Sequence, residues 1–84
     1  MRTKKAQAAA LVGMLAAATG GEPRTAHTDT GALRIEAELP DELTPTTRTA
    51  ILTALAIADR YGHARTDTTD TVWAELDGEA EGNR

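Results

Sequence analysis

Two histidines, His27 and His63, are the residues of this sequence best suited to bind a metal ion or to transfer a proton near neutral pH. The 84-residue chain has no cysteine, and its histidines are not spaced as a pair on one helical turn. A zinc site would therefore need both histidines and a carboxylate to converge from distant segments. The sequence predicts no metal site and no cofactor. His63 is expected near a helix C-terminus, where a cation is favoured, or in water.

Paired carboxylates and hydroxyl groups are the other side chains that could catalyse a reaction. Glu36 with Glu38, and Asp41 with Glu42, could supply acid–base chemistry only inside a pocket that shifts their pKa values. The chain has many threonines but no serine, and no glycine-rich turn places a hydroxyl beside a histidine. Phosphate-binding glycine motifs are missing from the sequence as well. We therefore expect no enzymatic activity and no catalytic residues.

The stretch DRYGHAR gathers cations around an aromatic residue. Arg60, His63 and Arg65 could contact phosphates while Tyr61 stacks on a base, as in a small nucleic-acid-binding regulator. In the alternative interpretation, Arg60 stabilises the end of a helix and Tyr61 packs over it. The net charge of −4 favours the second interpretation, because binding to a phosphate backbone requires an excess of cations.

The elements that position these residues belong to one small domain, since 84 residues are too few for two separate cores. With one tryptophan, one tyrosine and no phenylalanine, the interior must consist of leucine, isoleucine, valine and alanine. No apolar run reaches the roughly 18–20 residues that cross a bilayer, so no membrane contact is expected.

The opening segment MRTKKAQAAALVGMLAAATGG fits two different structures. Basic residues, an apolar stretch over 6–18 and a run of alanines are typical of a secretion signal that is cleaved near Ala18. On a helix, however, Leu11 and Leu15 lie on one apolar stripe, which two glycines then end. We expect a structural helix over 4–19 and a cytoplasmic protein, with a secreted protein as the alternative.

A second helix is predicted over 44–61. Thr44 is a suitable N-cap, the proline that follows fits the first turn, and Gly62 supplies the stop. Its apolar residues Ile51, Leu52 and Leu55 repeat the spacing found forty residues earlier in the first helix.

The same pattern also follows each helix: a short strand, a Thr-Asp-Thr turn, and a longer alternating strand that ends in Ala-Glu-Leu. These predict hairpins over 24–39 and 62–77. The chain therefore reads as two αββ repeats in one domain, residues 1–77. We expect an α+β fold, a two-layer sandwich in αββαββ order, with a four-stranded antiparallel sheet and two helices on one face. The tail 78–84 is expected to be disordered.

Alternation along the last strand places Val72, Ala74 and Leu76 toward the helices and Trp73 on the opposite, otherwise polar face. Trp73 is the least expected residue there. Either it packs on the side chain of an arginine, Arg34 or Arg65, as a cation–π pair, or it anchors a contact with another chain.

The sequence therefore favours a small, non-enzymatic protein-interaction or regulatory module that forms a homodimer through the open sheet face, or binds another protein there. Six residues are expected to bind the partner: Trp73, Arg34, Glu36, Arg65, Tyr61 and His63. The alternatives are a nucleic-acid-binding regulator that uses Arg60, His63 and Arg65, and an exported protein with a signal peptide over 1–18.

Overall fold

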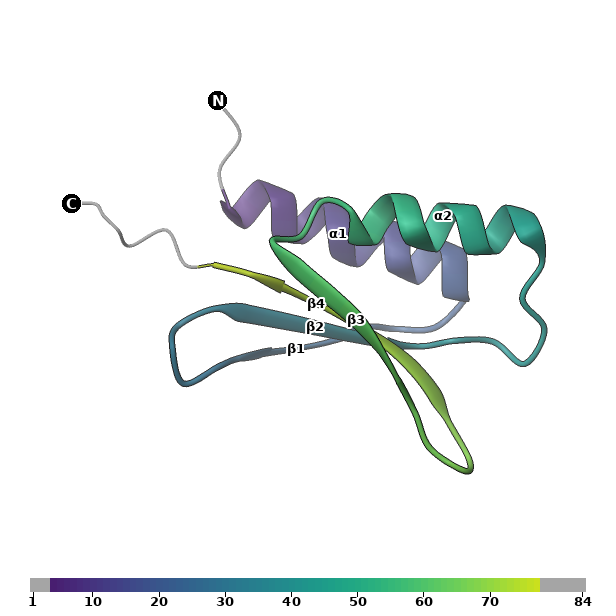
Figure 1. The fold of residues 1–84 in the computed structure, drawn as a ribbon. Helices are drawn as coiled ribbons and strands as arrows, with labels where there is room; N and C mark the ends of the chain where they lie inside the picture. The colour runs from purple at the N-terminus through teal and green to yellow at the C-terminus, as the bar shows by residue number, and fades with distance from the viewer. Residues whose placement is uncertain (1–3, 78–84) are drawn as a thin grey trace.

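The computed structural model describes residues 4–77 and shows an α+β protein in two layers, with two helices on one side of an open sheet (Figure 1). The elements follow the predicted αββαββ order: α1 (Lys4–Thr19), β1 (Arg24–His27), β2 (Leu33–Glu38), α2 (Pro45–Leu55), β3 (Arg60–Arg65) and β4 (Asp70–Leu76). The tail over 78–84, which the sequence predicts to be disordered, lies outside the described residues.

The four strands form one antiparallel sheet in the order β1-β2-β4-β3. The longer strand of each hairpin therefore lies at the centre, and the shorter strand forms an edge. Across the central pair, Glu36 lies opposite Trp73, with Ile35 opposite Ala74 and Ala37 opposite Val72. An approximate two-fold axis near the Glu36–Trp73 pair would exchange β2 with β4 and β1 with β3, which agrees with the strand order and the register. The sequence repeat thus corresponds to an internal symmetry of the sheet.

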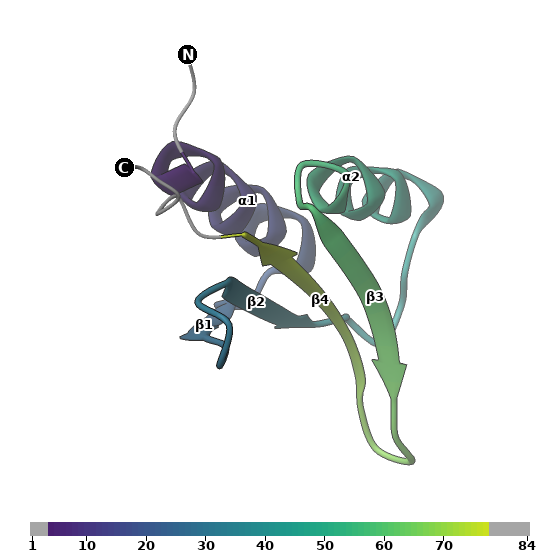
Figure 2. The same ribbon diagram turned by 60° about the vertical axis from the view of Figure 1, so that its left-hand side comes forward.

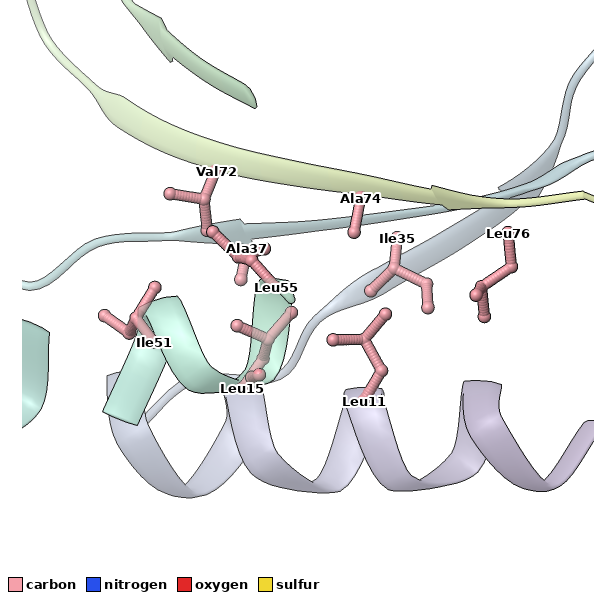
Figure 3. Close-up of a cluster of buried hydrophobic side chains, with 10 residues drawn as sticks. Leu11, Leu15, Ile35, Ala37, Ile51, Leu55, Val72, Ala74 and Leu76 are labelled. Atoms are coloured by element: carbon pink, nitrogen blue, oxygen red, sulfur yellow. The ribbon is translucent and has the colours of Figure 1, made fainter. Parts of the chain in front are cut away.

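The core lies between the helices and one sheet face (Figure 3). Leu11, Leu15 and Ile35 are fully buried in it. The predicted alternation along β4 is confirmed, because Val72, Ala74 and Leu76 are buried and the residues between them are only partly covered. Burying a leucine or isoleucine side chain stabilises a fold by roughly 1.5–3 kcal/mol, so this cluster is the main source of stability.

The helix α1 belongs to this core, as its apolar stripe predicts. Leu11 and Leu15 point from α1 toward the sheet, and Gly20 ends the helix with a φ of 77° and an N–H that donates to the carbonyl of Ala16. Loss of residues 1–18 would remove both leucines from the core. Neither helix within residues 4–77 has the length and hydropathy needed to span a membrane.

The helix α2 begins as the sequence predicts. The Thr44 hydroxyl accepts a hydrogen bond from the backbone N–H of Thr47 at 3.1 Å, and Pro45 occupies the first turn. It ends at Leu55, however, which is earlier than the predicted helix over 44–61.

The residues after α2 belong to the sheet instead. Strand β3 pairs with β4 from Arg60 opposite Glu75 to Arg65 opposite Asp70. Because this pairing gives the backbone a complete ladder of interstrand hydrogen bonds, it outweighs the local helical pattern. Gly62 is therefore a residue in the middle of a strand rather than a helix stop, and Tyr61 lies on the strand rather than over a helix end.

Candidate functional site

The six residues predicted to bind a partner are divided between the two faces of the sheet. Arg34, Glu36 and Trp73 lie on the open face, which no helix covers (Figure 2). The remaining three, Tyr61, His63 and Arg65, alternate along β3 on the helix side of the sheet. The open face and the helix side of β3 therefore have to be considered as separate candidate surfaces.

A line of ion pairs crosses the open face through all four strands. Arg24 on β1 lies 3.3 Å from Glu36 on β2, and Glu36 in turn lies 2.8 Å from Arg34. Arg34 reaches Glu75 on β4 at 2.8 Å, and Arg60 on β3 reaches Glu75 at 3.3 Å. Arg60 also contacts Asp77 at 2.7 Å. These charges are satisfied within the protein.

The same contacts shift the ionisation of the residues involved. Hydrogen bonds from Arg34, and to a smaller extent from Arg24, hold the pKa of Glu36 below its ordinary value, although partial burial opposes the shift. Hydrogen bonds to Glu36 and Glu75 raise the pKa of Arg34. Glu36 and Arg34 are therefore both charged at neutral pH.

Trp73 lies within this network rather than above it. The guanidinium carbon of Arg34 is 4.6 Å from the centroid of the indole ring, which is a cation–π contact. On the neighbouring strand, a Cβ atom at Gly62 would come within 2.6 Å of Cζ2 of Trp73, so the ring lies directly over the glycine. The sequence offered packing on Arg34 or Arg65 as one of two alternatives for Trp73, and the structure shows the contact with Arg34. The sequence did not predict the glycine platform, because Gly62 was interpreted as a helix stop.

The basic residues of the DRYGHAR stretch do not form one cluster. Arg60 contacts Asp77 and Glu75 on the open face, whereas His63 and Arg65 both reach Asp70 from the helix side. Burial acts to raise the pKa of Asp70, but hydrogen bonds from His63 and Arg65 hold it below its ordinary value. A phosphate would have to displace these carboxylates.

The helix side of the sheet has an apolar groove between α2 and β3. The groove has a volume of about 400 Å³ and is lined by residues of α2, β3, β4 and the β2–α2 connection: Leu39, Leu43, Arg48, Ile51, Leu52, Leu55, Tyr61, Gly62, His63 and Val72. We call this the α2–β3 groove. Leu52 and Tyr61, which are 52% and 51% exposed, are the exposed large hydrophobic residues of the described chain, and both line it.

The sequence did not reveal this groove, for two related reasons. The sequence pattern predicts Leu52 in the apolar stripe of the second helix and Tyr61 at the end of that helix. Once α2 ends at Leu55, the chain turns back so that Tyr61 lies on an edge strand beside α2. The available signal was the stripe itself, since adjacent Ile51 and Leu52 point about 100° apart on a helix. In the structure, Ile51 is buried and Leu52 is half exposed.

Within residues 4–77, no group of three histidine, aspartate or glutamate residues is placed to hold a metal ion. No protein-family model matches the sequence, and neither curated proteins nor solved structures gave a match. The functional argument therefore depends on the geometry of the two surfaces.

Proposed function

We propose that the protein is a non-enzymatic protein-interaction module that binds a partner protein in the α2–β3 groove. The observation that carries the proposal is that Leu52 and Tyr61, each about half exposed, line the same concave apolar site. A single exposed apolar residue is ordinary on a protein surface. Two large ones on either side of an apolar hollow are typical of a binding site.

The contrast with the open face supports this choice of surface. A partner that covers Trp73 would also cover the ion pairs of Arg34, Glu36 and Glu75, and removing paired charges from water is costly. A partner in the groove meets mainly leucine, isoleucine and valine side chains instead. Homodimer formation through the Trp73 face is the competing hypothesis, and it has a separate test.

The groove is tested by selecting peptides from a random display library on the immobilised full-length protein. Selected peptides are then titrated against Leu52→Asp, which places a charge in the groove, and against Thr49→Asp. Thr49 is an exposed residue of the same helix that does not line the groove, so it is the matched control. We expect Leu52→Asp to abolish binding and Thr49→Asp to retain it. If no peptide is selected, or if both variants bind equally well, the groove is not the site.

The open face is tested by sedimentation of the wild type and Trp73→Ala. A wild type that sediments as a dimer and a folded Trp73→Ala that sediments as a monomer would assign the interface to the open face. We expect instead that the substitution lowers stability and leaves the sedimenting mass unchanged.

A further inference from the structure

The free edge of β3 borders the α2–β3 groove. The groove is lined by three consecutive residues of β3, Tyr61, Gly62 and His63. Because consecutive residues of a strand point to opposite faces, the backbone of β3 itself borders the groove. No strand covers this edge within the described residues, because β3 is the last strand of the sheet (Figure 2). An edge strand carries unpaired backbone donors and acceptors that a further strand can bind.

The register identifies those backbone groups. The backbone N–H of Thr66 donates to the carbonyl of Thr69 at 2.8 Å, which makes this a hydrogen-bonded pair next to the turn. In an antiparallel ladder such pairs alternate with pairs that are not hydrogen-bonded. Counting back along the strand, the N–H and carbonyl groups of Tyr61, His63 and Arg65 point away from β4. The outward-pointing backbone groups of Tyr61 and His63 lie at the groove.

The charges around the groove indicate which side chains a further strand should carry. No aspartate or glutamate lines the groove, although the protein has a net charge of −4. Arg48, which does line it, is the one arginine of residues 4–77 that forms no ion pair with an acid of that range. An apolar site with an unpaired cation at its rim complements a segment that is both apolar and acidic.

A second copy of this chain complements the same edge less well than an acidic segment does. Neither edge strand contains an acid, since β1 carries Arg24 and β3 carries Arg60 and Arg65. A pair of β3 strands would therefore bring together four arginines with no carboxylate from the strands themselves. An acidic segment would instead bring opposite charge to this edge.

We infer that β3 binds an extended acidic segment of a partner protein as a fifth strand, with alternate apolar side chains in the α2–β3 groove and a carboxylate at Arg48. This inference rests on the proposed function and adds the backbone geometry and the charge of the ligand. Strand addition would supply main-chain hydrogen bonds for affinity, while the groove supplies side-chain specificity.

Two synthetic peptides test the charge requirement. The first is an eight-residue peptide of alternating valine and glutamate, and the second has lysine in place of glutamate. We expect the acidic peptide to bind at least about tenfold more tightly, and Arg48→Glu to reduce its affinity by about tenfold or more. Arg48→Gln should give an intermediate affinity. Equal binding of the two peptides, or no effect of Arg48→Glu, would overturn the assignment of an acidic ligand.

The backbone requirement is tested on both partners. In the protein, His63→Pro removes an N–H that points away from β4, so the sheet can keep its ladder while the added strand loses a donor. His63→Gln is the matched control, because it loses the imidazole contact to Asp70 and keeps the N–H. In the peptide, N-methyl groups are placed on the odd or on the even residues. We expect His63→Pro and only one of the two methylated peptides to lose binding.

The outcomes separate this inference from the proposed function. Strand addition would be excluded by three results together: Leu52→Asp loses peptide binding, His63→Pro binds normally, and both methylated peptides bind equally. The protein would then still be a groove-binding module. Binding that survives Leu52→Asp would exclude the groove itself. Should His63→Pro fail to fold, the methylated peptides decide the question on the unchanged protein.

Discussion

The two αββ halves have the same order of elements but differ in how closely the helix packs against the sheet. In the first half, α1 packs against both β2 and α2, and its leucines 11 and 15 have no exposed surface. In the second half, α2 packs closely on α1 but stands away from β3, so that Leu52 and Tyr61 are half exposed. The repeat therefore accounts for the fold, and the departure from it creates the groove.

The hairpins differ at one equivalent position as well. Four residues before the Thr-Asp-Thr turn of each hairpin, Arg24 pairs with Glu36 in the first and Gly62 pairs with Trp73 in the second. The first pair is an ion pair and the second is an aromatic ring over a glycine. Arg34 connects the two pairs, since it binds Glu36 and stacks on Trp73.

The largest effect is expected from truncating one leucine in each helix. Leu15→Ala removes a fully buried side chain and should lower the free energy of unfolding by about 2–5 kcal/mol. Leu52→Ala removes a half-exposed side chain and should cost less than about 1 kcal/mol. Urea unfolding followed by far-UV circular dichroism measures both. Equal losses of unfolding free energy would mean that α2 packs against the sheet as closely as α1 does. The two halves would then not differ in packing.

A smaller effect is expected from Gly62→Ala. The new methyl group would overlap the ring of Trp73, and such overpacking costs about 1–3 kcal/mol. At the equivalent position of the first hairpin, Arg24→Ala breaks an exposed ion pair and should cost less than about 1 kcal/mol. In a Trp73→Ala background the cost of Gly62→Ala should vanish. A cost that persists there would show that the backbone, and not the ring, requires glycine.

The symmetric part of this molecule was predictable from local patterns. Helix periodicity around Leu11 and Leu15, the Thr44 cap, and alternation along β4 each follow from a few neighbouring residues, and the repeat of these patterns predicted the αββαββ order. In the first turn, Gly31 adopts a positive φ of 88°, which glycine tolerates without strain.

The asymmetric part depends on contacts between distant segments, which local patterns do not contain. The end of α2 at Leu55 is set by pairing of β3 with β4, and Gly62 has a special role only because Trp73 lies on the adjacent strand. The groove depends on both features. Sequence reasoning therefore named Trp73, Arg34, Tyr61 and His63 as partner-binding residues, but it could not separate the residues of the open face from those of the groove.

The smallest effect concerns the pH dependence of the first hairpin. Because Arg34 and then Arg24 lower the pKa of folded Glu36, its stabilisation is complete above the ordinary value of 4.5 and is lost as the pH falls through the lower folded-state pKa. Glu36→Gln should therefore lower stability by less than about 1 kcal/mol at pH 7 and flatten the acid limb of a plot of unfolding free energy against pH. Asp70, whose pKa is also lowered, should preserve part of that limb.

Glu38→Gln is the matched control, because Glu38 is an exposed glutamate on the same strand that makes none of these ion pairs. It should flatten the acid limb less than Glu36→Gln does. The equivalent position in the second hairpin is Trp73, which carries no charge, so Glu36 should account for this component of the acid sensitivity by itself. If Glu36→Gln and Glu38→Gln flatten the limb to the same extent, the arginines act through the summed charge of the open face. The ion pair at Glu36 would then have no specific role in the first hairpin, in contrast to the Trp73 ring over Gly62 in the second.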